Sequence, residues 1–285
     1  MSRPYSVYDV FTSTPFTGNP LAVVEDATGL DDTAMQKIAR EFNFSETTFV
    51  FPPEDPANTA RVRIFTPTME LAFAGHPTVG TSTALYERGR AGSSLVLELG
   101  VGPIPVEIQN GWAEFRTRVP LSVGESISLD EIGRCIGQSG DVVRTDRHVP
   151  VLAGLGTDFV LAELNGPAAL ATAAPDVAAF RAAAGADADR LALLVYIRDG
   201  NQINARMFQP LGGIPEDPAT GSAAAALAAW LGRLDGTSQA FDISQGVEMG
   251  RPSVIKASVT VEDGEPVEVS IAGQAVKVME GTLTL

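Results

Sequence analysis

The chain has 285 residues, and its 35 Asp and Glu outnumber its 20 Lys and Arg, which gives a formal charge of −15 at neutral pH. This composition argues against a nucleic-acid partner, because phosphate contacts need clustered Lys and Arg and no such cluster is visible. No apolar run approaches the roughly 20 residues of a membrane span, and the N-terminal residues lack the apolar core of a secretory signal. We therefore expect a globular protein with no membrane partner and a cytoplasmic location.

Residues that bind metals or form disulfides are scarce. The only cysteine is Cys135, and the two histidines are His76 and His148. One cysteine cannot form an internal disulfide, and this set is too small for a structural zinc site. No fingerprint of a nucleotide or pyridoxal cofactor occurs, so we predict a protein without cofactors or metals. Cys135 follows Ile132 by one helical turn and is predicted to lie in the core, and His148 is predicted to be structural.

The first elements predicted are a strand pair and a helix. Residues 5–11 alternate aromatic or β-branched residues with polar ones, and extended structure resumes at residues 21–24. The turn-rich loop between them, residues 12–20, is either a plain hairpin connection or a wall of a pocket. A helix is expected to start at Asp31 or Asp32 and to end near Asn43, because apolar residues recur with helical spacing at positions 35, 38, 39 and 42.

Residues 44–51 are rich in β-branched and aromatic side chains and predict a strand. Strand alternation places Glu46 on the same face as Phe44, Thr48 and Val50. A carboxylate on such an apolar face is expected to have a raised pKa through desolvation, which suits proton exchange near neutral pH. The alternative is that Glu46 pairs with an arginine or caps a turn.

A further strand is predicted over residues 61–65, followed by a loop and a helix over residues 78–87. His76 stands beside Pro77 at the expected helix start. The positive end of the helix dipole would disfavour its charged form, which predicts a neutral, hydrogen-bonding imidazole. A plain capping role is the alternative. Three strands over residues 95–99, 104–108 and 113–119 then predict a meander.

Residues 120–125 are expected to connect to the second half of the chain. There, Ser128 and Glu131 form a capping box that opens a helix through Gly137. The alanine-rich residues 168–186, interrupted at Pro175, predict one or two helices. The dipeptide Asp199-Gly200 is a strong hairpin signal. Strands are predicted at residues 158–162, 191–197, 202–208, 241–244, 253–261, 267–272 and 274–285.

The stretch from Gly212 to Trp230 is the one around which the chain is organised. Its glycines and prolines are expected to prevent regular structure before Ala219, and the alanines after it predict a helix that starts near Thr220–Ser222 and ends at Gly232. The first N–H groups of a helix lack carbonyl partners and carry partial positive charge. The turn Thr220–Ser222 is therefore suited to bind an anion.

The two halves share this design. Each has Arg-x-Phe-x-Pro at the end of a strand, at Arg63–Pro67 and at Arg206–Pro210, followed by a loop, a turn with glycine and a helix. This repetition predicts two lobes of similar build, each pointing a helix N-terminus at the gap between them. We place the N-terminal lobe at residues 1–119, with the strand 276–285 returning to it, and the C-terminal lobe at residues 120–275.

Several motifs resemble the phenazine-biosynthesis isomerase (PhzF-like) family, and the similarity runs through the whole chain. The motifs are Asp9–Val24, Ser45–Val50, Arg63–Pro67, Glu70–Pro77, Glu216–Ala223 and Met249–Ser253. The block Glu-Asp-Pro-Ala-Thr-Gly-Ser at 216–222 is specific. The resemblance implies the α+β diaminopimelate epimerase fold, in which two pseudo-symmetric lobes each wrap a barrel-like, mostly antiparallel sheet around a central helix, with the active site in the cleft.

The resemblance also implies cofactor-free proton transfer. Glu46 matches the family's proton-shifting glutamate, and His76, Asp217 and Ser222 match its histidine, aspartate and serine. The related two-cysteine epimerases have a cysteine before the glycine of each turn. Ala74 and Thr220 stand at those places here, so a two-thiol mechanism is absent. Ala72 stands where the family commonly has proline, a departure that bears on the shape of the loop.

The preferred hypothesis is an isomerase acting by general acid/base catalysis on a small anionic metabolite, either amino-acid-like or of cyclohexadiene type. Glu46, His76 and Asp217 are its expected catalytic residues. The expected substrate-binding residues are Gly75, Thr220, Gly221 and Ser222. A cysteine-free racemase or epimerase using the same cleft is one alternative, and a non-catalytic binding protein is another. We expect a homodimer.

Overall fold

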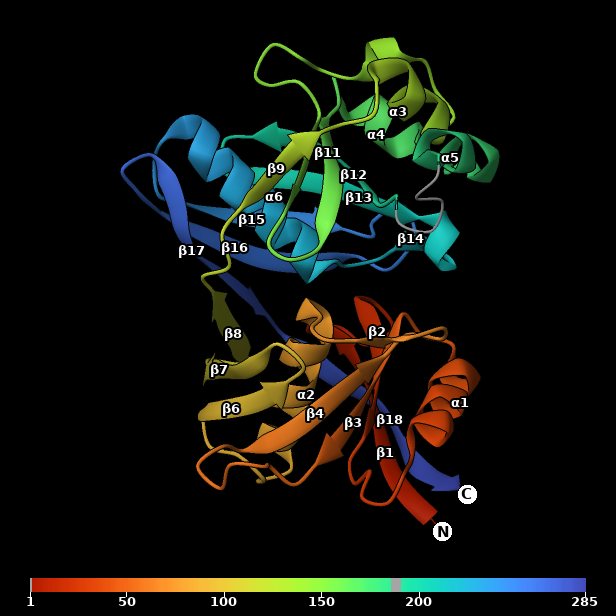
Figure 1. Ribbon diagram of the computed structural model, residues 1–285, viewed down its shortest axis with the longest axis vertical. Helices are drawn as coiled ribbons and strands as arrows, with labels where there is room; N and C mark the ends of the chain where they lie inside the picture. The colour runs from red at the N-terminus through yellow and green to blue at the C-terminus, as the bar shows by residue number, and fades with distance from the viewer. Residues whose placement is uncertain (1, 186–190) are drawn as a thin grey trace. The chain divides into compact units, whose positions relative to one another are not determined.

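The computed structural model describes residues 2–185 and 191–285 (Figure 1). The chain forms two compact units. Unit 1 comprises the residues up to Arg116 together with Ile271–Leu285, and unit 2 comprises Thr117–Ser270. The sequence placed the first boundary at residue 119 and the return of the chain at residue 276. Both boundaries in the structure fall inside strands, β8 (Trp112–Thr117) and β17 (Glu265–Gly273).

Unit 1 is one continuous sheet with two helices. By hydrogen-bonded pairing its strands run in the order β18, β1, β2, β3, β4, β6, β7 and β8, and β5 pairs with β4. The pairs β2–β3 and β4–β6 are parallel and the others antiparallel. Its elements besides β8 are β1 (Ser2–Val10), β2 (Asn19–Val24), α1 (Asp32–Phe42), β3 (Glu46–Phe51), β4 (Ala60–Phe65), β5 (Glu70–Leu71), α2 (Gly75–Glu87), β6 (Ser94–Leu99), β7 (Gly102–Gln109) and β18 (Ala275–Thr284).

Unit 2 repeats this pairing order. Its strands run β9, β10, β11, β12, β13, β15 and β16, with β14 paired to β13, and the parallel pairs are again the third and fifth. The duplication that the sequence predicted is thus confirmed in the connectivity of the strands. The elements are β9 (Ser122–Glu125), α3 (Leu129–Cys135), η1 (Gly140–Val142), β10 (Val151–Gly154), β11 (Asp158–Glu163), α4 (Pro167–Thr172), α5 (Val177–Ala184), β12 (Leu193–Asp199), β13 (Gln202–Gln209), η3 (Pro210–Gly212), β14 (Ile214–Asp217), α6 (Gly221–Asp235), β15 (Gln239–Gln245) and β16 (Ser253–Glu262).

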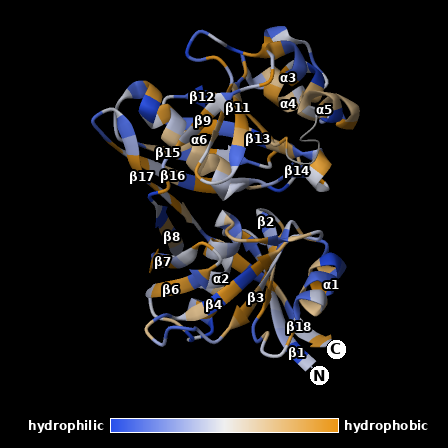
Figure 2. Ribbon diagram, viewed as in Figure 1, coloured by the Kyte–Doolittle hydropathy of each residue, from blue (hydrophilic) through white to orange (hydrophobic). Residues whose placement is uncertain are grey.

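Each unit has a central helix. Every residue of α2 from Gly75 to Leu85 is buried, and the helix contacts strands along the whole sheet of unit 1, from β18 to β7. In unit 2, α6 is buried over most of its length and contacts β10, β11, β15 and β16. Along the surrounding strands, hydrophobic and hydrophilic residues alternate, as β4 shows (Figure 2). The apolar face of each sheet therefore covers its helix.

Local signals in the sequence place many element ends correctly. Asp31 caps α1 by accepting a hydrogen bond from the backbone N–H of Ala34 at 2.7 Å, and Asn43 ends the helix in the left-handed conformation. The capping box at Ser128 opens α3, and the chain breaks at Pro175 into two helices. The last residue of that alanine-rich prediction, residue 186, lies outside the described residues. Cys135 is buried in the core beside Ile132, as predicted.

Three predictions of local structure were wrong. Residues before Ala219 are not all irregular, because β14 pairs with the C-terminal end of β13, and Pro215 lies at the irregularity in this pairing, where a proline is tolerated. Residues 122–125 are not only a connection but form β9 against β10. The helix α6 does not end at Gly232 but continues to Asp235. Gly232 serves packing instead, since a Cβ there would lie 2.7 Å from Val259.

The start of α2 also differs from its prediction. The helix begins at Gly75 rather than Thr78, so His76 and Pro77 are part of its first turn, a position that proline tolerates because the first N–H groups have no intrahelical partner. Within the two described ranges, no helix is both long enough and apolar enough to cross a membrane.

Candidate functional site

Glu46 and His76 come together in unit 1. Glu46 is the first residue of β3, and His76 is the second residue of α2. Oε2 of Glu46 lies 3.1 Å from Nδ1 of His76, and the two side chains are 14% and 4% exposed. The structure therefore brings a nearly buried carboxylate next to an imidazole, from segments about thirty residues apart. This juxtaposition is suited to moving or stabilising a proton.

Asn19 and Ser45 complete this group of polar side chains. The hydroxyl of Ser45 donates to Oδ1 of Asn19 at 2.9 Å, which directs the Asn19 amide nitrogen to Nδ1 of His76, 3.4 Å away. Two polar groups face Nδ1: the amide of Asn19 can only donate to it, and the ionised carboxylate of Glu46 can only accept from it, so these contacts allow either neutral tautomer. Nε2 is buried and makes no hydrogen bond to the described residues. Nε2 of a neutral His76 is thus left for a ligand, as a donor in one tautomer and an acceptor in the other.

The imidazole of His76 is held in its neutral form. Burial lowers its pKa from 6.5 to about 3, and the carbonyl of Pro20 offsets part of this effect. The sequence predicted a neutral ring because of the helix dipole, but desolvation is the largest cause of the lowered pKa. At any pH from 5 to 8 the ring is therefore a donor or acceptor of hydrogen bonds rather than a cation.

This shift predicts how stability depends on pH. A histidine of the unfolded chain has a pKa of about 6.5. As the pH falls below that value, His76 becomes protonated in the unfolded state but stays neutral in the folded state. Stability should then fall between pH 6.5 and 3 by up to about 1.4 kcal/mol per pH unit. Urea unfolding from pH 7 to 4.5 measures this, and His76→Gln should show a shallower dependence. A His76 ring that titrates near pH 6.5 in NMR spectra would contradict the prediction.

The N-terminus of α2 lies beside this group. Its N-cap residue, Ala74, has extended backbone geometry and no side chain that could bond to the first turn. The first N–H groups of the helix, starting at Gly75, are therefore not capped by the N-cap side chain, and the dipole adds partial positive charge there. This end of α2 is suited to hold a carboxylate close to His76.

In unit 2, Asp217 and Thr220 form a hydrogen-bonded turn before α6. Asp217 ends β14 and is 5% exposed, and the hydroxyl of Thr220 donates to its Oδ2 at 2.5 Å. The side-chain amide of Gln245 makes three hydrogen bonds to this turn. Gly221 and Ser222 follow as the first residues of α6, and the side chain of Thr220 does not cap the helix.

The predicted site residues therefore fall into two groups, one in each unit. Glu46, Gly75 and His76 lie together in unit 1, and Asp217, Thr220, Gly221 and Ser222 are contiguous in unit 2. Sequence reasoning missed two neighbours, Asn19 and Gln245. The motif Thr-Gly-Asn-Pro at 17–20 was a signal for the first, since the loop was already considered as a pocket wall. No motif in the sequence pointed to Gln245.

Cys135 and His148 are structural. The pKa of the Cys135 thiol is raised to about 11 because it is buried, so it carries no thiolate at neutral pH. His148 is buried, with Nε2 2.6 Å from the hydroxyl of Tyr196 and Nδ1 2.7 Å from the carbonyl of Val149. Both ring nitrogens of His148 are thus bonded within the fold, which agrees with the structural role predicted from the sequence.

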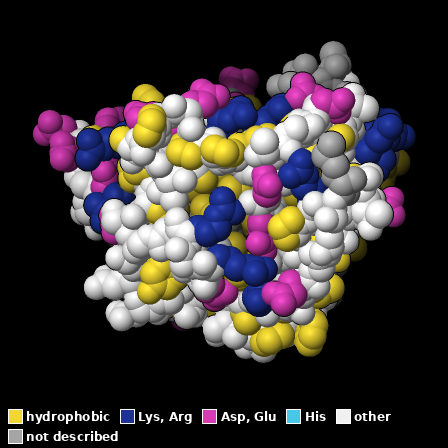
Figure 3. Space-filling model, turned by 90° about the horizontal axis from the view of Figure 1, so that it is seen from below, with side chains coloured by type: hydrophobic (Ala, Val, Ile, Leu, Met, Phe, Trp, Pro, Cys, Tyr) yellow, Lys and Arg dark blue, Asp and Glu magenta, His cyan; other side chains and the backbone are white. Residues whose placement is uncertain are grey.

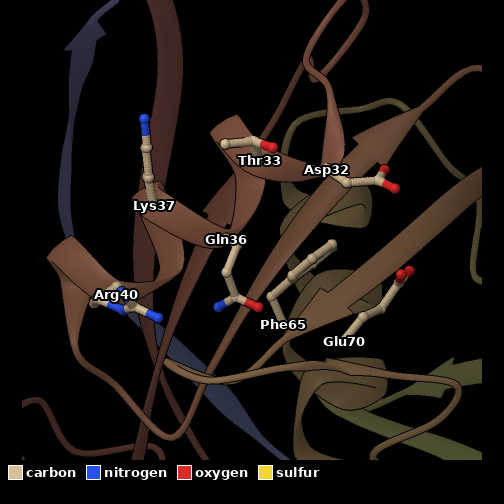
Figure 4. A pocket seen from close by; sticks show the side chains of 7 residues that line it. All are labelled: Asp32, Thr33, Gln36, Lys37, Arg40, Phe65 and Glu70. Carbon is tan, nitrogen blue, oxygen red and sulfur yellow. The ribbon is translucent and has the colours of Figure 1, made fainter.

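Two surface depressions of unit 1 contain none of these residues. One, of about 480 Å³, is lined by Asp32, Thr33, Gln36, Lys37, Arg40, Phe65 and Glu70 (Figure 4). The other, of about 560 Å³, borders the same Glu70 and includes Arg63. Arg63 is engaged with Glu70 and Asp32 at 2.6–2.7 Å. On the face shown in Figure 3, basic and acidic side chains are intermixed, and no broad patch of one sign stands out.

Comparison with known sequences shows the family. The sequence profile described as phenazine biosynthesis-like protein (PhzC-PhzF) matches residues 8–281. A protein named as an uncharacterized isomerase from Mesorhizobium japonicum is 39% identical, with 99% of both chains covered. The trans-2,3-dihydro-3-hydroxyanthranilate isomerase of Pseudomonas chlororaphis is 37% identical, also with 99% of both chains covered.

Solved structures agree with this result. A phenazine biosynthesis protein of the PhzF family from Bacillus anthracis matches over the full length of both chains with a TM-score of 0.89 and 26% identity. A hydroxyproline epimerase from Agrobacterium vitis, 13% identical, matches all of this chain and 93% of its own with a TM-score of 0.65, which shows a shared fold. From the profile, the relatives and the duplicated sheets around two central helices, we conclude that this isomerase has the diaminopimelate epimerase-like fold and belongs to the PhzC-PhzF, phenazine biosynthesis-like family.

Proposed function

We propose that the chain is a cofactor-independent isomerase that moves a proton between carbons of a small carboxylate-bearing substrate, with Glu46 as the general base and acid. The observation that carries the proposal is the pair formed by Glu46 and a neutral His76, 3.1 Å apart. His76 is buried, but its Nε2 makes no hydrogen bond to the described residues. A buried ring nitrogen without a partner costs free energy, which a bound ligand would recover.

In the proposed reaction, Glu46 takes a proton from an activated carbon of the substrate and becomes a carboxylic acid. It then returns this proton to another carbon of the same conjugated system, so that a double bond moves and no oxidant or reductant is needed. His76 assists as a neutral ring whose Nδ1 lies 3.1 Å from Oε2 of Glu46 and whose Nε2 is left for the substrate. The N–H groups at the start of α2 hold the substrate carboxylate.

The residues of unit 2 have a parallel role in the proposal. Asp217, with Thr220 bonded to its carboxylate, would assist proton transfer or bind an amino group of the substrate. Gly221 and Ser222 would bind a carboxylate at the start of α6, where the helix dipole favours negative charge. Such local groups would have to attract an anion against the overall charge of −15.

A cyclohexadiene-type amino acid is the substrate we propose to test first, since the 37% identical relative is named for trans-2,3-dihydro-3-hydroxyanthranilate. Incubation with this compound and with a panel of amino acids and cyclohexadiene carboxylates in D₂O, followed by ¹H NMR, tests the proposal. A moved double bond, formed without added metal or cofactor, is the expected result. If no compound reacts, or if turnover is abolished by a chelator and restored by one metal, the proposal fails.

The same spectra distinguish a racemase or epimerase, the alternative favoured by the repeated helix N-termini. A racemase needs a base on each face of one carbon, and it would incorporate deuterium at that carbon with inversion and without a moved double bond. The positions held by Ala74 and Thr220 offer no thiol, so its bases would have to be other groups. The proposal also includes a cytoplasmic homodimer. Light scattering coupled to size-exclusion chromatography tests the dimer.

A further inference from the structure

We propose that Gln245 is a positioning residue for the Asp217 carboxylate, because its amide fixes the direction of the hydrogen bond from Thr220 to Asp217. This inference rests on the proposed function, since it assigns Asp217 a part in the reaction. Its physical basis lies entirely within unit 2 and concerns residues of β14, β15 and the turn before α6.

The side chain of Gln245 is directed into the turn. Gln245 is the last residue of β15, is 1% exposed and pairs with Ala205 of β13 and Ser253 of β16. Its Oε1 accepts from the backbone N–H of Thr220 at 3.2 Å. Its Nε2 donates to the backbone carbonyl of Asp217 at 2.7 Å and to the hydroxyl of Thr220 at 3.1 Å. Both ends of the turn are therefore tied to one amide.

The orientation of this amide is forced by the backbone. The N–H of Thr220 needs an acceptor and the carbonyl of Asp217 needs a donor, so Oε1 must face the first and Nε2 the second. Nε2 then donates to the hydroxyl of Thr220, which has one proton of its own. That proton must go to Oδ2 of Asp217, 2.5 Å away. The amide thus makes Thr220 a donor to the Asp217 carboxylate.

Unit 1 shows that the fold does not require an amide at this position. The glycine after each strand packs on the residue before the helix turn: a Cβ on Gly100 would lie 2.8 Å from Ala72, and one on Gly246 would lie 2.6 Å from Pro218. This correspondence places Leu99 of β6 at the position of Gln245. Leu99 is buried and apolar, and no carboxylate corresponds to Asp217, since Leu71 stands at that place. The Gln245 amide is therefore present in the unit that has the Asp217 carboxylate and absent from the unit that lacks it.

The test compares Gln245→Leu and Gln245→Glu with the wild-type protein. Leucine is the residue that unit 1 tolerates, and glutamate keeps the size and the acceptor but cannot donate when ionised. Both variants should lose about tenfold in kcat/KM, because each lacks the Nε2 donor that orients the Thr220 hydroxyl toward Asp217, and the misdirected bond is one hydrogen bond of ordinary net strength. Amide hydrogen exchange at Thr220 should accelerate in Gln245→Leu but stay slow in Gln245→Glu, which retains the acceptor.

The control is Ile243→Val, which removes one methyl group from the core face of the same strand. It should lower the melting temperature while kcat/KM stays at the wild-type value. If both Gln245 variants are as active as this control, Gln245 only fills space and the inference is wrong. If the wild-type protein turns over none of the compounds tested, the proposed function fails instead, and the pattern of Thr220 exchange still decides whether the amide holds the turn.

Discussion

Replacing Glu46 with glutamine should reduce turnover by about 10²- to 10⁴-fold, the usual effect of losing a general acid or base. Glutamine has nearly the same size and can stay beside His76, but it cannot accept a proton from carbon. Because Glu46 is the first residue of β3 and 14% exposed, the substitution should leave the folded structure unchanged. Steady-state kinetics on the substrate identified by NMR, with a melting curve of the variant, measures both effects.

The matched control for this substitution is Glu41→Gln. Glu41 is an exposed residue of α1, so the same chemical change there should alter neither activity nor stability. Loss of deuterium incorporation into the substrate in Glu46→Gln, but not in Glu41→Gln, would identify the proton-transfer step as the one affected. If Glu46→Gln keeps near wild-type activity, then Glu46 is not the base.

The sequence predicted the elements of this fold well where the signal was local. The cap at Asp31, the capping box at Ser128 and the hairpin at Asp199-Gly200 each depend on residues within four positions of one another. The repeated Arg-x-Phe-x-Pro motif predicted the duplication, because the same residues stand at the ends of β4 and β13, which hold equivalent positions in the two sheets. Strand alternation was also enough to put Glu46 at the edge of an apolar environment.

Features set by tertiary contacts could not be predicted in this way. Pro215 argued against a strand, yet β14 forms because the C-terminal end of β13 extends beyond its pairing with β15 and is open to β14. Asn19 contacts His76 across 57 positions of sequence, and Gln245 reaches Thr220 across 25. Contacts between residues so far apart in the sequence produce no periodic pattern from which they could be predicted. The low pKa of His76 likewise follows from burial of the whole helix α2, which no single residue in the motif reveals.

The largest effect on stability is expected at Arg206, whose replacement by methionine should destabilise unit 2 by about 3–5 kcal/mol. Its guanidinium makes two hydrogen bonds of 2.8 Å to the carboxylate of Glu216, and the two side chains are only 7% and 12% exposed. It also donates to the carbonyls of Leu170 and Ala173 at 3.0 and 2.6 Å, near the end of α4. Methionine would leave a buried carboxylate and these carbonyls without their donor.

Arg63 provides the comparison, because it occupies the same place in the motif of unit 1. Its guanidinium also makes two hydrogen bonds to one carboxylate, that of Glu70. It lies over the ring of Phe65 at 5.2 Å from the ring centre, and the guanidinium of Arg206 lies 5.0 Å from the centre of the Phe208 ring. Its partners are more exposed, with Glu70 at 41%. Water can replace the lost contacts there, so Arg63→Met should cost about 1 kcal/mol or less.

Urea unfolding followed by the fluorescence of Trp230, with Trp112 replaced by phenylalanine, reports on unit 2 and measures the effect of Arg206→Met. Adding Glu216→Gln to Arg206→Met should restore part of the lost stability, because it removes the carboxylate that the first change left unpaired. A space-filling role for Arg206 would give no such recovery. Equal losses for Arg63→Met and Arg206→Met, each measured in its own unit, would show that burial does not decide the strength of these two ion pairs.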